Sequence, residues 1–278
     1  MIWNASPILF SIGSFQLHWY GVLFGTGFLV GSNIFRNQFV KKGLDPQHID
    51  PLVVYMIIGT VVGARLGHTL IYQPEIYLHD PIRILKVWEG GLASHGGALG
   101  VVLSTWLWAR KYWKGSFIQL LDFLAVPTPL VCAFIRMGNL FNSEILGKPS
   151  DVPWAVTFQR VDSIPRHPAM LYECFAYLFT YWVMRKMFKR GLTEKAGTIL
   201  GTFLIMLFSF RFFIEFFKEL QVPSEATLPM DLGQLLSIPF VLVGVFLVVR
   251  ASKMASTPLP ESAMMKEENP AKKKKKKR

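Results

Sequence analysis

The sequence predicts an all-α polytopic membrane protein with seven transmembrane helices and a small extracytoplasmic head. Three observations predict this class. Of the 278 residues, 51% are hydrophobic and only 17% are charged, against roughly 25% charged residues in soluble proteins. Apolar windows of about the 20 residues that a helix needs to cross a bilayer recur along the chain. Lysines and arginines gather in the segments between these windows.

Seven spans are expected, and the charge of their connections orients them. The spans lie near residues 18–35, 51–73, 92–109, 117–135, 168–184, 197–217 and 231–249. One set of connections holds 21 lysines and arginines in total: 36–50, 110–116, 185–196 and 250–278. The opposite set holds seven: 1–17, 74–91, 136–167 and 218–230. Because basic connections stay in the cytoplasm, the amino terminus is predicted outside and the carboxyl terminus in the cytoplasm.

The chain divides into a bundle and a tail. Residues 1–250 are expected to form a transmembrane catalytic bundle that includes a surface arm at 74–91, read as an amphipathic helix, and an extracytoplasmic head at 136–167. Residues 251–278 are expected to be a disordered basic cytoplasmic tail. Its lysines are either attracted to anionic lipid or simply solvated. The net charge of +12 follows from these segments, so no nucleic-acid partner is expected.

Small residues predict how some spans pack. Gly59, Gly63 and Gly67 repeat every four residues, as do Gly96 and Gly100, and such faces allow close contact between helices. Arg65 lies on the same stretch and needs a partner inside the bundle, for which a structural ion pair is expected.

The most polar stretch near a predicted span begins at Arg136 and ends at Gly147. On a helix, Arg136, Asn139 and Asn142 share one face, and Glu144 follows two residues later. A polar helix end emerging into water is one explanation. Polar groups at membrane depth more often line a protected site, so a functional cluster is favoured.

Other polar groups are individually weaker signals. Arg211 and Glu215 are four residues apart, so they form either a structural pair or a phosphate-binding group. His95 is a candidate proton acceptor or a hydrogen-bonded structural residue. Tyr20 is read first as an interfacial anchor.

All of these groups fall at predicted outer ends of helices, which favours chemistry on a lipid headgroup. Tyr172 and Glu173, at the start of the fifth span, are expected to cap or brace the head, in which residues 154–158 resemble a strand. The sequence contains no metal-ligand spacing, phosphate-binding glycine loop or Gly-x-Ser-x-Gly elbow, so neither a metal nor a cofactor is expected.

At these residues the chain resembles the bacterial phosphatidylglycerol-prolipoprotein diacylglyceryl transferases. The family signature Gly-Arg-x-Gly-Asn-Phe-x-Asn-x-Glu-x-x-Gly is met by Arg136, Gly138, Asn139, Asn142, Glu144 and Gly147. Ile135 and Leu140 depart from it, and Met170 stands where the family usually carries glutamine. The likeness also covers 18–21, 63–67, 90–97, 167–173 and 211–216.

The resemblance implies an enzyme of the bacterial inner membrane. It would transfer the diacylglyceryl group of phosphatidylglycerol to the lipobox cysteine in a prolipoprotein signal peptide, form a thioether and release glycerol phosphate. His95 is the expected base, Arg136 and Arg211 the expected phosphate ligands, and Tyr20 a hydrogen-bond donor to substrate. Asn139, Asn142, Glu144, Gly147 and Glu215 are expected to bind or orient the lipid headgroup and the arginines. The alternatives are a transporter or channel for a small anionic solute and a structural membrane protein.

Overall fold

The computed structural model describes residues 1–73, 75, 80–86, 91, 93–219 and 230–265. The chain forms two compact units. The first comprises Met1–Phe35 and Leu121–Pro258, and the second comprises Arg36–Leu120 and Leu259–Arg278.

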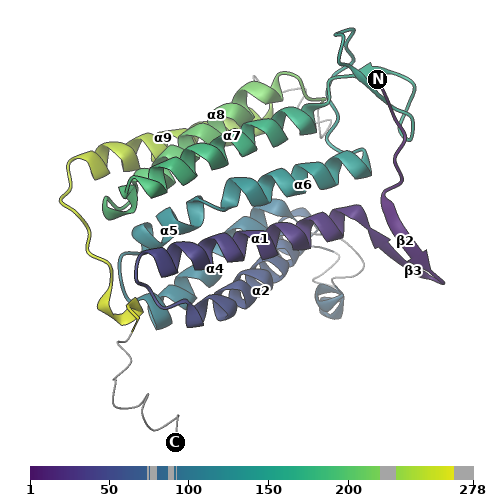
Figure 1. The fold of residues 1–278 in the computed structure, drawn as a ribbon. Helices are drawn as coiled ribbons and strands as arrows, with labels where there is room; N and C mark the ends of the chain where they lie inside the picture. The colour runs from purple at the N-terminus through teal and green to yellow at the C-terminus, as the bar shows by residue number, and fades with distance from the viewer. Residues whose placement is uncertain (74, 76–79, 87–90, 92, 220–229, 266–278) are drawn as a thin grey trace, which may run out of the picture. The chain divides into compact units, whose positions relative to one another are not determined.

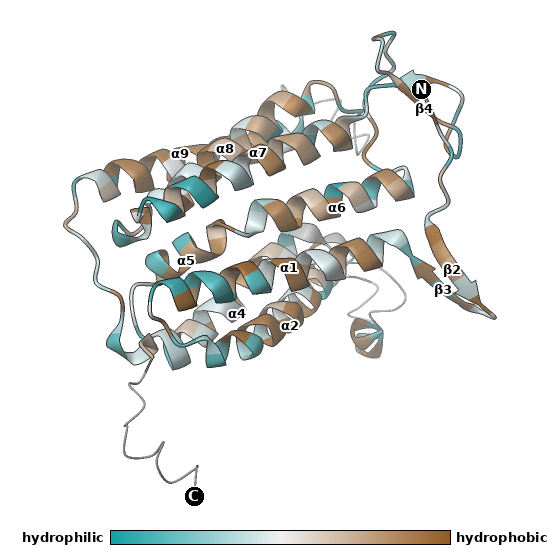
Figure 2. Cartoon of the chain, in the orientation of Figure 1, coloured by the Kyte–Doolittle hydropathy of each residue, from teal (hydrophilic) through white to brown (hydrophobic). Residues whose placement is uncertain are grey.

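In the first unit, helices that follow one another in the chain pack side by side and run in opposite directions. Its helices are α6 (Thr128–Asn142), α7 (Ala169–Lys189), α8 (Thr198–Glu215) and α9 (Leu232–Ser252), together with most of α1 (Trp19–Lys41) and α5 (Phe117–Ala125). Helix α6 packs against α7, α7 against α8, and α8 against α9 (Figure 1). The polar colour on the last turns of α6 in Figure 2 marks the start of the site described below.

The second unit is centred on α2 (Ile49–Gly67) and α4 (Ser94–Trp108). Helix α2 continues through a π-helical turn at His68–Tyr72, and α4 continues through another at Ala109–Trp113. Short 3-10 helices lie at Pro46–His48, Pro81–Leu85 and Glu261–Ala263. A further 3-10 turn in the first unit spans Leu192–Glu194.

Helices α2 and α4 pack through the glycines that the sequence singled out. A Cβ atom added to Gly63 would lie 2.9 Å from the Cα of Gly100, and one added to Gly67 would lie 2.9 Å from the Cα of Gly96. The two backbones are therefore nearly in contact, which only glycine permits. The predicted close helix packing is confirmed.

Each of the seven predicted spans contains a helix, but fewer helices meet a strict test of length and composition. Within the described residues, three helical stretches are long and apolar enough to cross a membrane: Pro46–Ile71, Thr198–Glu215 and Leu232–Ser252. The bent pair α5 and α6 makes a fourth if it counts as one span. Helix α4 has 15 residues, about 22 Å at 1.5 Å per residue, and α1 and α7 end in basic turns.

The fourth predicted span is broken. We expected one helix near 117–135, whereas α5 ends at Ala125 and α6 starts at Thr128 with a bend of 48°. Pro127 and Pro129 flank the start of α6, and a proline tolerates the first turn of a helix but not its interior. Because α6 continues to Asn142, residues 136–142 of the predicted head belong to a helix.

The head contains strands that an all-α description leaves out. Strand β4 (Val156–Phe158) pairs in parallel with β1 (Ile2–Trp3) and antiparallel with β5 (Pro165–Arg166). A separate hairpin joins β2 (Ile8–Ile12) to β3 (Phe15–His18). The predicted strand at 154–158 is confirmed in β4, whereas the strands of the first 18 residues were missed.

Half of the predicted surface arm at 74–91 lies outside the described residues. Within its described part, Pro81–Leu85 is a 3-10 helix. Arg65 is buried on α2 and donates hydrogen bonds to the carbonyl oxygens of Arg83 at 2.5 Å and Ile84 at 2.9 Å. The guanidinium thus ties this segment to α2, and the predicted ion pair of Arg65 stays a prediction.

The tail is ordered at its start. Residues 251–252 complete α9, and the backbone of Met264 pairs with that of Leu44. Ser262 donates to the carbonyl of Trp113 at 2.7 Å. The prediction of a disordered tail from residue 251 is therefore wrong for residues 251–252, which are helical, and for residues 262–264, which bond to backbone groups of the second unit. Residues 266–278 lie outside the described residues.

The start of α8, in the first unit, is capped by a side chain that is distant in the sequence. Asp122 on α5 is fully buried, and its carboxylate accepts from the amides of Gly197 at 2.6 Å and Leu200 at 2.7 Å. These amides belong to the first turn of α8, which has no intrahelical partners for them. The carboxylate therefore fixes α8 against α5.

Candidate active site

The last turns of α6 carry a continuous chain of polar contacts. Arg136 donates from Nη1 to Oδ1 of Asn139 at 2.9 Å. Asn139 donates from Nδ2 to Oε2 of Glu144 at 2.9 Å, and Asn142 donates to the other oxygen of Glu144 at 3.0 Å. Helix α6 ends at Asn142, and Ser143 adopts a left-handed conformation, which turns Glu144 back onto the helix. The predicted one-face arrangement is what makes this chain possible.

A second carboxylate holds Arg136 from α7. Glu173 is fully buried, and its Oε2 forms an ion pair with Nε of Arg136. Its Oε1 lies 2.9 Å from Nζ of Lys218. Arg136 also lies against the ring of Tyr177, 6.0 Å from its centroid. A buried carboxylate needs hydrogen-bonding or charged partners, and Glu173 has two cations.

The chain of charges continues to Glu215, which corrects one prediction. Nζ of Lys218 lies 3.1 Å from Oε2 of Glu215, so Glu215 pairs with Lys218 three residues on instead of with Arg211. Arg211 is half-buried on α8 and acts electrostatically on Glu173. Among the described residues Arg211 has no hydrogen bond or ion pair.

Tyr20 joins this group from α1. It is half-buried and lies against Gly138, where an added Cβ would come within 2.8 Å of the tyrosine ring. The phenol interacts electrostatically with Glu144 and Arg136. The structure thus brings together Tyr20 and the polar end of α6, and the glycine permits their close approach.

Gly147 lies where the head meets the end of α8. Its amide donates to the carbonyl of His167 at 3.0 Å, and its backbone pairs with that of Lys218. A Cβ on Gly147 would lie 2.8 Å from the carbonyl oxygen of Phe217. Gly147 therefore lies between the backbones of His167 and Phe217, where a side chain would not fit.

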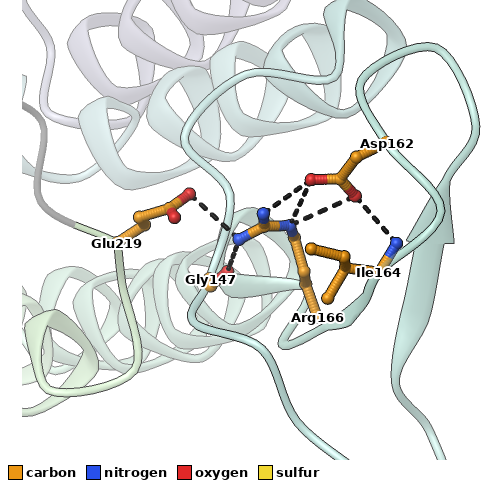
Figure 3. A network of polar contacts seen from close by, with 5 residues as sticks. All are labelled: Gly147, Asp162, Ile164, Arg166 and Glu219. Atoms are coloured by element: carbon orange, nitrogen blue, oxygen red, sulfur yellow. Dashed lines mark hydrogen bonds and ion pairs between the residues drawn. The ribbon is translucent and has the colours of Figure 1, made fainter.

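Arg166 fastens this junction, as Figure 3 shows. It is buried, and its Nη2 lies 2.6 Å from Oδ2 of Asp162. Nη1 donates to Oε2 of Glu219 at 3.0 Å and to the carbonyl of Gly147 at 3.4 Å. The hydrogen bond from Arg166 holds the pKa of Asp162 below its usual value, and the same contact raises the pKa of Arg166.

Tyr172 braces the head, as predicted. Its hydroxyl accepts from Nε1 of Trp154 at 2.7 Å and lies 3.0 Å from Nδ1 of His167. Glu173, predicted to do the same, instead forms ion pairs with Arg136 and Lys218.

The comparisons with known proteins identify the family of the chain. The family model of prolipoprotein diacylglyceryl transferase matches residues 7–250. The chain belongs to this family. A relative from Tolumonas auensis is 47% identical over 253 residues, covering 91% of this chain and 98% of its own length. A relative from Chloroherpeton thalassium is 44% identical, covering 92% and 96%. Both are called phosphatidylglycerol-prolipoprotein diacylglyceryl transferase.

Membership of the diacylglyceryl transferase family confirms the resemblance and gives no support to a transporter or channel. The expected residues Tyr20, Arg136, Asn139, Asn142, Glu144, Gly147, Arg211 and Glu215 all belong to the first unit. His95 belongs to the second, where it is exposed at the second residue of α4.

Lys218 and Glu173 are the residues of this polar cluster that sequence reasoning missed. Lys218 was counted as one basic residue of an external connection, although it is only 3% exposed. Glu173 was read as a brace for the head. A carboxylate inside a predicted span requires a partner, and that requirement was the available signal for Glu173.

Proposed function

We propose that this protein transfers the diacylglyceryl group of phosphatidylglycerol to the lipobox cysteine of prolipoproteins, the first step of lipoprotein maturation. The cysteine sulfur forms a bond to the glyceryl carbon, and the bond from that carbon to the phosphate oxygen breaks. Glycerol phosphate leaves with the electron pair, and the thiol proton passes to a base. The enzyme is a transferase that acts as a multi-pass protein of the bacterial inner membrane.

One observation carries this proposal: family motif residues form the polar chain from Arg136 to Glu144 in a chain matched by the family model. Arg136 is held in one orientation by Asn139 and Glu173. The guanidinium N–H groups of Arg211 have no hydrogen-bond partner among the described residues. A guanidinium suits a phosphate because its planar fork gives paired, charge-assisted hydrogen bonds.

Both arginines then act on the same phosphate in two states of the reaction. In the ground state they bind the headgroup, and in the transition state they stabilise the charge that develops on the leaving oxygen. Tyr20 donates a hydrogen bond to substrate from the α1 side. Asn142, Glu144 and Gly147 hold the end of α6 and the turn after it in place around the headgroup.

The activity is tested with purified protein in detergent, phosphatidylglycerol and a lipobox peptide. We expect the peptide to gain the mass of one diacylglyceryl group, and a peptide with serine in place of cysteine to gain none. Folded protein that modifies neither peptide contradicts the proposal. Capture of phosphatidylglycerol without transfer would point to a lipid-binding protein.

His95 is proposed as the base that raises the thiolate fraction, since a free thiol has a pKa near 8.5. A His95→Gln variant is expected to lose most activity near pH 7 and to regain part of it toward pH 9, where hydroxide generates the thiolate. The pH profile of turnover measures this. Full activity across that profile excludes His95 as the base.

A further inference from the structure

The buried charges around Glu173 form an alternating series. Arg136, Glu173, Lys218 and Glu215 follow one another through contacts that join α6, α7 and the end of α8. Two cations face two carboxylates, so the four groups are neutral as a set. Arg211 adds one positive charge beside this set, and that excess charge suits an anionic ligand.

Lys218 decides how Glu173 acts on Arg211. With Lys218 at 2.9 Å, both oxygens of the Glu173 carboxylate are neutralised by partners other than Arg211. Without Lys218, one oxygen of a fully buried carboxylate would lack a partner. Such a charge is costly, and Arg211 is the nearby cation that could relieve it.

The backbone around Lys218 is held by hydrogen bonds to the segment 146–148. It pairs with Gly147, and the neighbouring hydrogen bonds run from Lys148 N to Phe217 O at 2.8 Å and from Glu219 N to Leu146 O at 3.1 Å. The Lys218 ammonium therefore reaches Glu173 from a segment that pairs like a strand with residues 146–148. This pairing requires glycine at position 147, because a Cβ there would lie 2.8 Å from the carbonyl oxygen of Phe217.

Glu215 is held on its other side by the start of α9. A Cβ on Gly233 would lie 2.7 Å from Oε1 of Glu215, so the carboxylate packs on the second residue of that helix. A helix start favours a negative charge. Glu215 thus packs against α9 while it pairs with Lys218.

We propose that Glu173 and Lys218 are positioning residues: Glu173 orients Arg136, and Lys218 neutralises Glu173 so that Arg211 stays free for the phosphate of the lipid substrate. The inference rests on the proposed function, because it assumes that Arg211 meets that phosphate. It assigns Lys218 an effect on lipid binding and none on the peptide.

The test compares Lys218→Met, Lys218→Arg, Glu173→Gln and the double variant Lys218→Met with Glu173→Gln. Turnover is measured as separate KM values for phosphatidylglycerol and for the lipobox peptide. Lys218→Met is expected to raise the KM for phosphatidylglycerol roughly tenfold to a hundredfold, the range for one hydrogen bond to a charged group. The KM for the peptide stays unchanged. Lys218→Arg retains the cation and stays near the wild type.

The double variant separates positioning from folding. Removing the Glu173 charge together with Lys218 leaves nothing to capture Arg211, so the KM for phosphatidylglycerol falls below that of Lys218→Met. It stops at the value of Glu173→Gln alone, because both variants lack the carboxylate that orients Arg136. Lys189→Met, the same change at an exposed lysine at the end of α7, serves as the control. Thermal unfolding in detergent is recorded for every variant.

Two results overturn the proposal. One is a Lys218→Met variant with both KM values unchanged, and the other is a loss that affects both substrates equally and follows thermal stability. Failure of the proposed function is recognised separately, because the wild-type protein would then form no product in the same assay.

Discussion

At the scale of single residues, the two arginines of the site differ in what surrounds them. Arg136 is bound by Asn139 and Glu173, whereas Arg211 has no such partner among the described residues. The same substitution therefore has different consequences at the two positions. We expect Arg136 to contribute to folding and to substrate binding, and Arg211 to contribute mainly to substrate binding.

Arg136→Ala is expected to lower both stability and turnover, because it leaves Glu173 with Lys218 alone. Breaking a buried ion pair by removing one partner costs roughly 3–5 kcal/mol. Arg211→Ala is expected to lower turnover about a hundredfold or more with an unchanged melting temperature. Thermal unfolding and product formation measure the two effects. Normal transfer by either variant would remove that arginine from the phosphate site.

At the scale of elements, the glycine contacts between α2 and α4 set a tight limit on side-chain volume. Gly63→Ala is expected to destabilise the protein by about 1–3 kcal/mol, the usual range for overpacking, because its new methyl group meets the backbone of α4. Gly25→Ala on α1 is the matched control, since a Cβ there has no atom within 4 Å. Thermal unfolding in detergent compares them, and equal melting temperatures would contradict the packing argument.

The head depends on pH through Asp162. Its folded pKa is lowered by Arg166, so its contribution to stability is present above the ordinary value of about 3.9 and is lost as the pH falls through the lowered folded value. We expect the head to keep its order from pH 5 to 8 and to loosen below about pH 4.

Limited digestion with pepsin, which is active in this range, measures that loosening. Asp162→Asn is expected to make the head accessible already at pH 5, whereas Asp151→Asn, a change at an exposed aspartate of the head, should digest like the wild type. A wild-type digestion pattern for Asp162→Asn would exclude the Asp162–Arg166 pair as a support of the head.

At the scale of the whole molecule, the predicted orientation places the head outside and the carboxyl end in the cytoplasm. Ser14→Cys and Asp151→Cys are expected to react with a membrane-impermeant maleimide in cells whose outer membrane is permeabilised. Ser256→Cys should react only after lysis, because it follows α9. Labelling of Ser256→Cys before lysis would reverse the topology.

Hydropathy located the seven helical regions because long apolar runs are a local signal. It missed the break before Thr128, since Val126 and Pro127 do not lower the mean hydropathy enough to end a window. It also missed β1, because its partner β4 lies about 155 residues away in the chain.

The polar end of α6 was predictable because Arg136, Asn139 and Asn142 are close in sequence and repeat at helical spacing. Lys218 was not, because its partner Glu173 lies on another helix. A single sequence carries no direct record of such a contact. The same limit explains the error on Glu215, for which the predicted partner, Arg211, and the observed one, Lys218, lie at similar distances along the chain.

The cap of α8 by Asp122 also bears on how the protein is made. The carboxylate is synthesised 75 residues before Gly197, the first amide that it accepts from. When the ribosome releases α8 for insertion, the Asp122 carboxylate that accepts from its first amides has already been synthesised. Helix α8 can therefore pack against α5 in the order in which the two helices are synthesised.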